Sequence, residues 1–287
     1  MTRIVYVNGA YKRYGEAAIH VEDRGFQFAD AVYEVIEVLG GRLVDATRHL
    51  ARLERSLREL AISPPMRESA LLHIIGEVIR RNRVRDGIVY MQVTRGAGPR
   101  EFALPGPDVL PTLVVFARTQ PRGRADRLAE TGIVVKTVPD NRWERCNIKT
   151  VMLLPAVLAK DAARRAGARE AWFVDSSGTI TEGASSNAWI VTAKGVLVTR
   201  PLGQEILPGV TRATVMDVAK AEGLRVEERA FTRDEALRAT EAFITSATNI
   251  AMPVVTIDGQ GIGNGLPGPL TRRLRSRFHQ MAEISAV

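Results

Sequence analysis

One lysine stands in a setting that suits covalent chemistry. Lys149 lies in the segment RCNIKT at positions 145–150, where we expect it to end a strand just before the apolar helical stretch 151–158. Apolar surroundings disfavour the charged form of an amine, and an uncharged lysine amine can form a Schiff base with a carbonyl compound. The alternative is an ordinary lysine at the end of a strand, exposed to water.

A single carboxylate occupies a loop of small residues further along the chain. Glu182 lies in the segment TEGASSN at 181–187, directly before an apolar strand expected at 188–191. Small residues let the backbone approach a ligand closely. A carboxylate in such a loop can face the nitrogen of a pyridine ring and keep it protonated, which makes the ring an electron acceptor. Otherwise Glu182 is a turn acid in contact with solvent.

Two further loops can meet a phosphate group. The segment LPGVTR at 207–212 leads into an expected helix, so free backbone N–H groups and the Thr211 hydroxyl could bind the anion while Gly209 permits close approach. The segment TSATN at 245–249 follows an expected strand and is a second candidate. Taken alone, Thr211 could equally be an ordinary helix N-cap.

The elements that must position these residues are a mixture of helices and strands. Asn8-Gly9 between apolar residues predicts a hairpin at 4–11. Leucines at alternating steps of three and four predict a helix that Thr47 could cap, with its apolar face formed by Leu50, Leu53, Leu57 and Leu60. The other expected helices span 68–81, 152–165, 211–222 and 269–282, and the other expected strands span 88–94, 112–117, 133–138, 171–174, 188–192, 241–245 and 254–257. We expect the strands 171–174 and 188–192 to pair.

The length of 287 residues predicts two domains of mixed α and β structure. The stretch 118–132 is polar and contains a proline and two glycines, which is typical of a connection between domains. We therefore expect a small N-terminal domain at 1–120, a linker at 121–132 and a larger domain at 133–287.

Composition excludes several classes of function. Hydrophobic residues make up 45% and charged residues 25%, the balance of a soluble globular protein, and no apolar stretch is long enough to predict a membrane partner. Cys146 is the only cysteine, so no disulfide within the chain is expected and the reducing cytoplasm is the expected location. The net charge of +8 comes from dispersed arginines rather than from a compact basic run, so we expect anionic small molecules and not nucleic acid as partners.

The four segments described above, in this order, resemble the class IV aminotransferases, the fold type IV enzymes that use pyridoxal 5′-phosphate (PLP). The segment EDRGFQFADAVYEV at 22–35 adds to the resemblance, which covers nearly the whole chain. Within the family the similarity is strongest to the D-amino-acid aminotransferases, through DRGFQFADAVYEV, VTRGAGPR, RWERCNIKTVMLL and EGASSN. The resemblance implies a two-domain mixed α/β fold, PLP as the cofactor and no metal ion.

The resemblance also implies a role for individual residues. Lys149 matches the Schiff-base lysine, and Glu182 matches the carboxylate that meets the pyridine nitrogen. Leu207 matches the residue that packs on one face of the cofactor ring. The positions that match the family's phosphate contacts are Arg52, Val210, Thr211, Ser246 and Ala247.

For the substrate carboxylate, the resemblance implies Tyr33 and Arg100. The D-amino-acid enzymes also use a histidine two positions after this arginine, but this chain has Phe102 there and an acid at Glu101. The carboxylate site therefore has fewer polar partners, which leaves the substrate range and the preference for D over L substrates open. Ala247, where threonine is common, lacks a hydroxyl but keeps its backbone N–H.

The function that follows is ping-pong transfer of an amino group from a D-amino acid to a 2-oxo acid, with Lys149 also moving a proton. By resemblance we expect a homodimer. The alternatives with the same cofactor residues are a branched-chain L-amino-acid aminotransferase, an (R)-selective amine transaminase and an aminodeoxychorismate lyase. A further alternative is a PLP-binding protein without catalysis.

Overall fold

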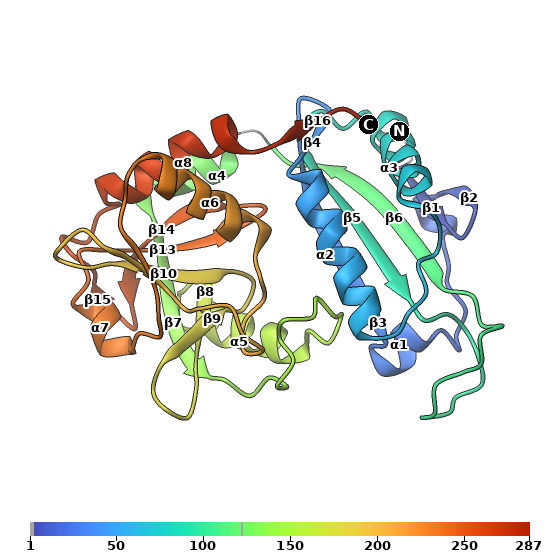
Figure 1. The fold of residues 1–287 in the computed structure, drawn as a ribbon, viewed down its shortest axis with the longest axis horizontal. Coiled ribbons are helices and arrows are strands. Elements are labelled where there is room, and N and C mark those ends of the chain that lie inside the picture. The colour runs from blue at the N-terminus through green and yellow to red at the C-terminus, as the bar shows by residue number, and fades with distance from the viewer. Residues whose placement is uncertain (1–2, 122) are drawn as a thin grey trace. The chain divides into compact units, whose positions relative to one another are not determined.

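The computed structural model describes residues 3–121 and 123–287, which form two units, each built around one β-sheet (Figure 1). Unit 1 comprises Met1–Arg122, Ile148–Met152 and Glu283–Val287. Unit 2 comprises Gly123–Asn147 and Leu153–Ala282. Both units combine helices with a sheet, which confirms the predicted mixed α/β architecture.

The sheet of unit 1 is antiparallel throughout, with the strand order β16-β4-β3-β5-β6-β1-β2. Its strands are β1 (Ile4–Val7), β2 (Ala10–Arg13), β3 (Ala31–Leu39), β4 (Arg42–Val44), β5 (Gly87–Thr94), β6 (Thr112–Thr119) and β16 (Ile284–Ser285). β1 and β2 form the predicted hairpin. Its turn residues Asn8 and Gly9 have φ values of 42° and 90°, the left-handed region that an Asn-Gly turn requires.

One face of this sheet is buried under helices α2 (Ala46–Glu59) and α3 (Glu68–Asn82), which pack on β3 and on β6 and β1 (Figure 1). The predicted leucine face of α2 is confirmed for Leu50, Leu53 and Leu57, which are buried, whereas Leu60 follows the last helical residue, Glu59. A short helix α1 (Arg24–Phe28) and a 3-10 turn η1 (Tyr14–Glu16) precede β3. Burial of one face leaves the other face of the sheet available to polar and aromatic side chains.

The start of α2 is held by a residue distant in sequence, and the prediction that Thr47 caps this helix is wrong. The N-cap residue is Asp45, with φ of 54°. Glu283 accepts hydrogen bonds from the Thr47 N–H at 3.3 Å and from the Thr47 hydroxyl at 3.0 Å. The Thr47 hydroxyl is thus a donor to Glu283, and the glutamate satisfies an N–H group of the first helical turn.

The sheet of unit 2 has the strand order β12-β11-β10-β13-β14-β7-β8-β9, with β15 paired to β14. Its strands are β7 (Ile133–Pro139), β8 (Glu170–Val174), β9 (Ile180–Gly183), β10 (Asn187–Val191), β11 (Leu197–Thr199), β12 (Val226–Glu228), β13 (Glu241–Ser246), β14 (Ile250–Ile257) and β15 (Gln260–Gly261). The expected pairing of strands 171–174 and 188–192 is wrong. β8 pairs with β7 and β9, whereas β10 lies between β11 and β13.

The helices of unit 2 are α4 (Arg124–Thr131), α5 (Leu154–Arg165), α6 (Val210–Ala221), α7 (Arg233–Leu237) and α8 (Pro269–Met281). α4 lies within the stretch interpreted as a linker. Its Ala129 is buried in the core that also contains Trp172, Ile190 and Ile244, so a sequence that reads as polar forms a helix with one packed face. Within the described residues, no helix is long and apolar enough to cross a membrane.

Candidate functional site

Lys149 belongs to unit 1, although the chain on both sides of residues 148–152 belongs to unit 2. Lys149 was predicted to end a strand, but it lies in a loop. The next helix, α5, begins at Leu154. The Lys149 carbonyl accepts a hydrogen bond from Tyr33 N–H at 3.0 Å, and Val151 N–H donates to the Ala31 carbonyl at 3.1 Å. These bonds fasten the backbone of the lysine to the first residues of β3.

The Lys149 side chain is half-buried over an aromatic row on the open face of the unit 1 sheet. Its Nζ lies 4.1 Å from the centroid of the Tyr33 ring. Tyr33 stacks on Tyr90 at 5.6 Å, and Tyr90 stacks on Phe116 at 4.9 Å. Burial, and to a smaller extent Tyr33, raises the pKa of Tyr90 to about 12, so its phenol stays neutral. The structure thus brings together two of the predicted residues, Lys149 and Tyr33.

Arg52 is buried on α2 and is gripped by a strand residue that sequence reasoning missed. Its Nε and Nη2 donate to the two carboxylate oxygens of Glu34 at 2.7 and 2.8 Å, and His49 Nδ1 lies 2.7 Å from the same carboxylate. Burial would raise the pKa of Glu34, but the charge and hydrogen bonds of Arg52 and His49 hold it well below its usual range. The available signal was a charged residue at a core-facing position of β3, between Val32 and Ile36.

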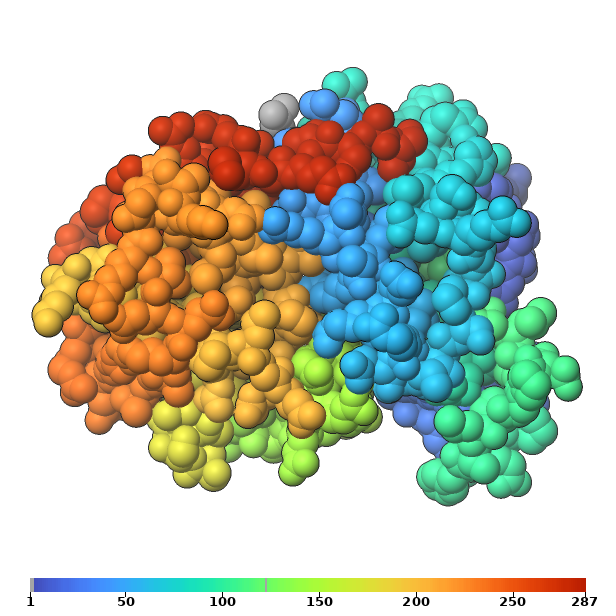
Figure 2. All heavy atoms as spheres, viewed as in Figure 1, coloured from blue at the N-terminus to red at the C-terminus, as the bar shows by residue number. Residues whose placement is uncertain are grey.

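Arg100 and Phe102 lie on the loop 95–111, which extends from unit 1 as the green segment in Figure 2. The Arg100 Cζ atom lies 5.4 Å from the centroid of the Phe28 ring, on α1. Phe102 contacts the same ring at a centroid distance of 5.6 Å and is 83% exposed. The position that differs from the predicted pattern therefore carries an apolar side chain in contact with water.

Glu182 lies within strand β9 of unit 2, so its expected place in a loop is wrong. Its side chain is buried, and both carboxylate oxygens are hydrogen-bonded. Oε1 accepts from Arg142 Nη1 at 2.5 Å, whereas Oε2 accepts from Asn187 Nδ2 at 3.0 Å and from Leu207 N–H at 3.1 Å. Arg142 and Asn187 were not predicted as site residues, although they lie inside the segments RWERCNIKTVMLL and EGASSN that carry the resemblance. Together with Leu207 they fix the direction of the carboxylate.

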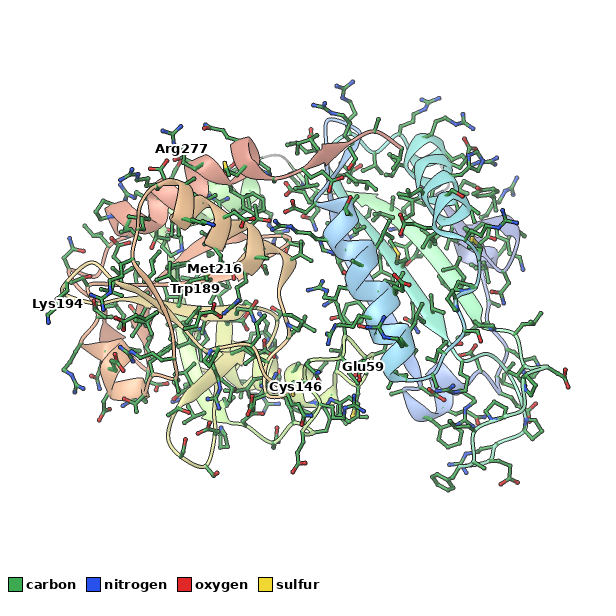
Figure 3. The ribbon with its side chains drawn as sticks, in the orientation of Figure 1. Glu59, Cys146, Trp189, Lys194, Met216 and Arg277 are labelled. Atoms are coloured by element: carbon green, nitrogen blue, oxygen red, sulfur yellow. The ribbon has the colours of Figure 1, made fainter. Side chains whose placement is uncertain are left out.

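Arg142 joins Glu182 to a second carboxylate. It donates to Asp140 and to the Thr181 hydroxyl, and its guanidinium lies 4.4 Å from the Phe173 ring. Burial lowers the pKa of Arg142, but the hydrogen bond to Asp140 and the charge of Glu182 more than offset this and raise it. Cys146, labelled in Figure 3, lies four residues after Arg142, between β7 and α5. Burial raises the pKa of its thiol to about 11. The thiol is therefore protonated at neutral pH, although the charge of Arg142 lowers its pKa.

The two candidate phosphate loops lie at the edges of regular elements of unit 2. α6 begins at Val210, and among the residues that the structure describes no side chain caps its start at Gly209. Val210 and Thr211 begin the first turn, whose N–H groups have no partner within the helix and therefore suit an anion. A Cβ atom on Gly209 would fall 2.0 Å from Asn187 Oδ1, which explains the glycine. Ser246 ends β13, and its hydroxyl accepts a hydrogen bond from Asn249 at 3.1 Å.

The predicted residues thus fall into two sets. Unit 1 carries Tyr33, Arg52, Arg100 and Lys149. Unit 2 carries Glu182, Leu207, Val210, Thr211, Ser246 and Ala247. Over the described part of the chain, no group of three or more His, Cys, Asp or Glu side chains could hold a metal ion. The chemistry that the predicted residues offer is that of an amine, a fixed carboxylate and donors for anions.

Comparison with known proteins assigns this arrangement to a family. The family model of amino-transferase class IV matches residues 31–257. The chain is 40% identical to a D-alanine aminotransferase of Bacillus licheniformis over 272 residues, which cover 95% of this chain and 94% of that relative. It is 36% identical to a D-alanine aminotransferase of Staphylococcus haemolyticus, with 97% of this chain and 98% of that relative covered.

Solved structures agree with the fold. The Escherichia coli branched-chain amino acid aminotransferase matches with a TM-score of 0.88 at 24% identity, covering 98% of this chain and 95% of that chain. The T.th. branched-chain amino acid aminotransferase with pyridoxamine 5′-phosphate matches with a TM-score of 0.88 at 26% identity, covering 98% of this chain and 94% of that chain. These likenesses confirm the predicted fold type.

Proposed function

Since the chain belongs to the class IV aminotransferases, as its motifs predicted, we propose that it uses PLP to transfer the amino group of a D-amino acid to a 2-oxo acid. D-alanine and D-glutamate are the proposed donors. The observation that carries the proposal is the buried Glu182, whose carboxylate is held by Arg142, Asn187 and the Leu207 N–H. The preference for D-amino acids is supported by similarity to the D-alanine aminotransferases along nearly the whole chain.

The residues present fit PLP, which has a phosphate group, a pyridine nitrogen and an aldehyde. The buried N-terminus of α6, which no side chain caps among the described residues, is a suitable phosphate site. Lys149 would hold the cofactor covalently as a Schiff base, Glu182 would meet the pyridine nitrogen, and Leu207 would pack on the ring. The proposed phosphate contacts are Arg52, Val210, Thr211, Ser246 and Ala247.

When bound, PLP supplies an electron-withdrawing ring that stabilises negative charge at the substrate Cα. Lys149 Nζ is the proposed acceptor of the proton that leaves Cα, a role supported by a backbone that is bonded to β3 and a side chain that lies over Tyr33. Glu182 cannot rotate away from its acceptor direction, since both of its oxygens are engaged. Tyr33 and Arg100 are the proposed partners of the substrate carboxylate, with the guanidinium binding it in a bidentate manner.

The first experiment is a panel of amino donors added to the purified holoenzyme. We expect D-alanine and D-glutamate to bleach the yellow absorption band of the bound cofactor, and a 2-oxo acid to restore it. L-leucine and (R)-1-phenylethylamine should bleach it far more slowly. Bleaching chiefly by L-leucine would instead assign the branched-chain activity named for the structural relatives. A protein that gains no band on addition of PLP would refute the cofactor assignment.

A homodimer is the proposed assembly, because large apolar side chains are exposed in two groups. On unit 1 they include Phe26 and Leu110, which are 73% and 79% exposed, and on α5 they include Leu154, Val157 and Leu158. Large exposed apolar side chains that gather on a surface are typical of subunit interfaces.

The lone Cys146 suits the reducing cytoplasm, where we propose that the enzyme acts.

Light scattering should therefore give a mass close to twice the 31.5 kDa of the chain. We expect Leu158→Glu to shift the protein toward the monomer, since a charge in an apolar interface is costly. Leu266→Glu is the matched control, because Leu266 is 63% exposed but lies outside both groups. A wild-type protein that is monomeric at micromolar concentration would contradict the proposal.

A further inference from the structure

The segment 22–35 contains three residues to which no role has been given so far: Arg24, Phe28 and Asp30. All three contact the loop that carries Arg100. The Arg24 side chain is only 5% exposed. Its Nε donates to Asp30 at 2.9 Å, and its Nη1 donates to the carbonyl oxygens of Glu101 at 2.6 Å and Ala103 at 3.4 Å. A buried guanidinium thus holds the main chain on both sides of Phe102.

Phe28 acts on the same loop through its ring. The Arg24 Cζ lies 4.7 Å and the Arg100 Cζ lies 5.4 Å from the ring centroid, and Phe102 packs at 5.6 Å. Arg24 and Phe28 are four residues apart on α1, so they lie on one face of that helix. The ring is therefore a platform for the guanidinium of Arg100.

Asp30 connects Arg24 and the loop to the end of α2 through Arg95. Besides Arg24, it accepts two hydrogen bonds from Arg95, at 2.7 and 3.0 Å, and Arg95 also donates to the carbonyl oxygens of Leu60 and Ala61. Burial would raise the pKa of Asp30, but its hydrogen bonds to Arg95 and Arg24 lower it. The carboxylate is therefore charged at neutral pH and ties the base of the loop to the end of α2.

We propose that Arg24 and Phe28 are positioning residues that set Arg100 in place for the substrate carboxylate and so determine how tightly amino acids and 2-oxo acids are bound. This inference rests on the role of Arg100 in the proposed function. Arg100 is a long, exposed side chain on an irregular loop, and ordering it only when substrate arrives would reduce affinity. The bonds from Arg24 and the ring of Phe28 order it beforehand.

A lysine could not replace Arg24 in this role. The guanidinium presents donors in a planar fork that reaches Asp30 and the Glu101 carbonyl together, whereas an ammonium is a point charge on a flexible stem. Arg24→Lys should keep the charge opposite Asp30 but lose the loop contacts. Arg24→Gln should lose both. Phe28→Leu should keep an apolar side chain and lose the platform.

The order of the loop is measured first, without reliance on catalysis. Trypsin can cut after Arg100, and release of the 1–100 fragment from the holoenzyme, followed by mass spectrometry, reports how often the loop opens. We expect Arg24→Gln to be cut there about tenfold faster than the wild type, because local opening governs cleavage. Arg81→Gln is the matched control, since Arg81 also lies over an aromatic ring, Tyr11 at 4.1 Å, but on α3. Equal cleavage of the wild type and Arg24→Gln would overturn the proposal.

Steady-state kinetics then separate positioning from general damage. For Arg24→Lys and Phe28→Leu we expect KM for D-alanine and for the 2-oxo acid to rise about tenfold while kcat stays within about twofold, because ground-state binding is affected. The cofactor absorption band should not change. Arg100→Ala should raise KM at least as much, and in that background Phe28→Leu should add nothing. If Arg24 variants fail to fold, Phe28→Leu decides, and an unchanged KM would overturn the inference. A wild-type enzyme that reacts with no amino donor would refute the proposed function, whereas the trypsin result would still test the loop.

Discussion

Replacing Lys149 by alanine should lower the turnover of amino group transfer by about 10⁴-fold or more, the upper range for a positioned acid–base group. The variant would lose both the proposed covalent hold on the cofactor and the amine that lies over Tyr33. The fold should persist, because the segment is fastened by backbone hydrogen bonds from Tyr33 and to Ala31. The measurement is single-turnover reaction with D-alanine, read from the cofactor absorption band, together with the melting temperature.

Lys160→Ala is the control for this variant. Lys160 lies on α5 and forms an ion pair with Glu170 of β8 at 2.7 Å. We expect removal of this lysine to leave turnover nearly unchanged. Added methylamine should partly restore the Lys149→Ala variant, since a free amine can take up the Cα proton. Substantial transamination by Lys149→Ala without added amine would exclude the lysine from catalysis.

Replacing Glu182 by glutamine should lower kcat by about 10² to 10³-fold, the usual loss when one preorganised charged group is removed from a site. The amide has nearly the same shape, so it can keep a contact with Asn187 or the Leu207 N–H. It cannot carry the negative charge that faces Arg142, and it cannot stabilise a protonated pyridine nitrogen. Stopped-flow absorbance with D-alanine should show slow bleaching at an almost unchanged affinity for PLP.

Asp140→Asn provides the comparison, because Asp140 is bound by the same arginine. Its carboxylate accepts from Arg142 at 2.8 Å but is not proposed to meet the cofactor. We expect a fall in kcat of less than about tenfold, due only to looser support of Glu182. Equal losses in both variants would show that the arginine network, and not the Glu182 charge at the ring, limits the rate.

Local patterns predicted most of the elements that build both sheets. Runs of apolar and β-branched residues located β5 and β6, and the leucine spacing located α2, because both signals come from side chains close in sequence. The pairing of β10 with β13 instead of β8 depends on contacts between distant segments. α4 was missed because its apolar face is narrow among polar residues.

The site shows the same division. Family motifs predicted Lys149, Glu182 and Arg52, since each motif is a short run of residues. Glu34 and Arg142 also lie inside quoted motifs, but their pairing with Arg52 and Glu182 could not be predicted, because the partners are 18 and 40 positions apart and only folding brings them together. The roles of Arg24 and Phe28 were hidden for the same reason, although both lie inside a recognised motif.

The contact between Glu283 and the start of α2 has a consequence for biosynthesis. α2 carries Arg52, and its first turn is held by a glutamate that is synthesised 236 positions after Thr47. β16, which follows Glu283, pairs with β4 just before that helix. Arg52 of the proposed phosphate site is therefore synthesised early, whereas Glu283, which holds the start of its helix, is synthesised late. Deletions or fusions that disturb residues 283–285 should impair cofactor loading although they lie far from it in sequence.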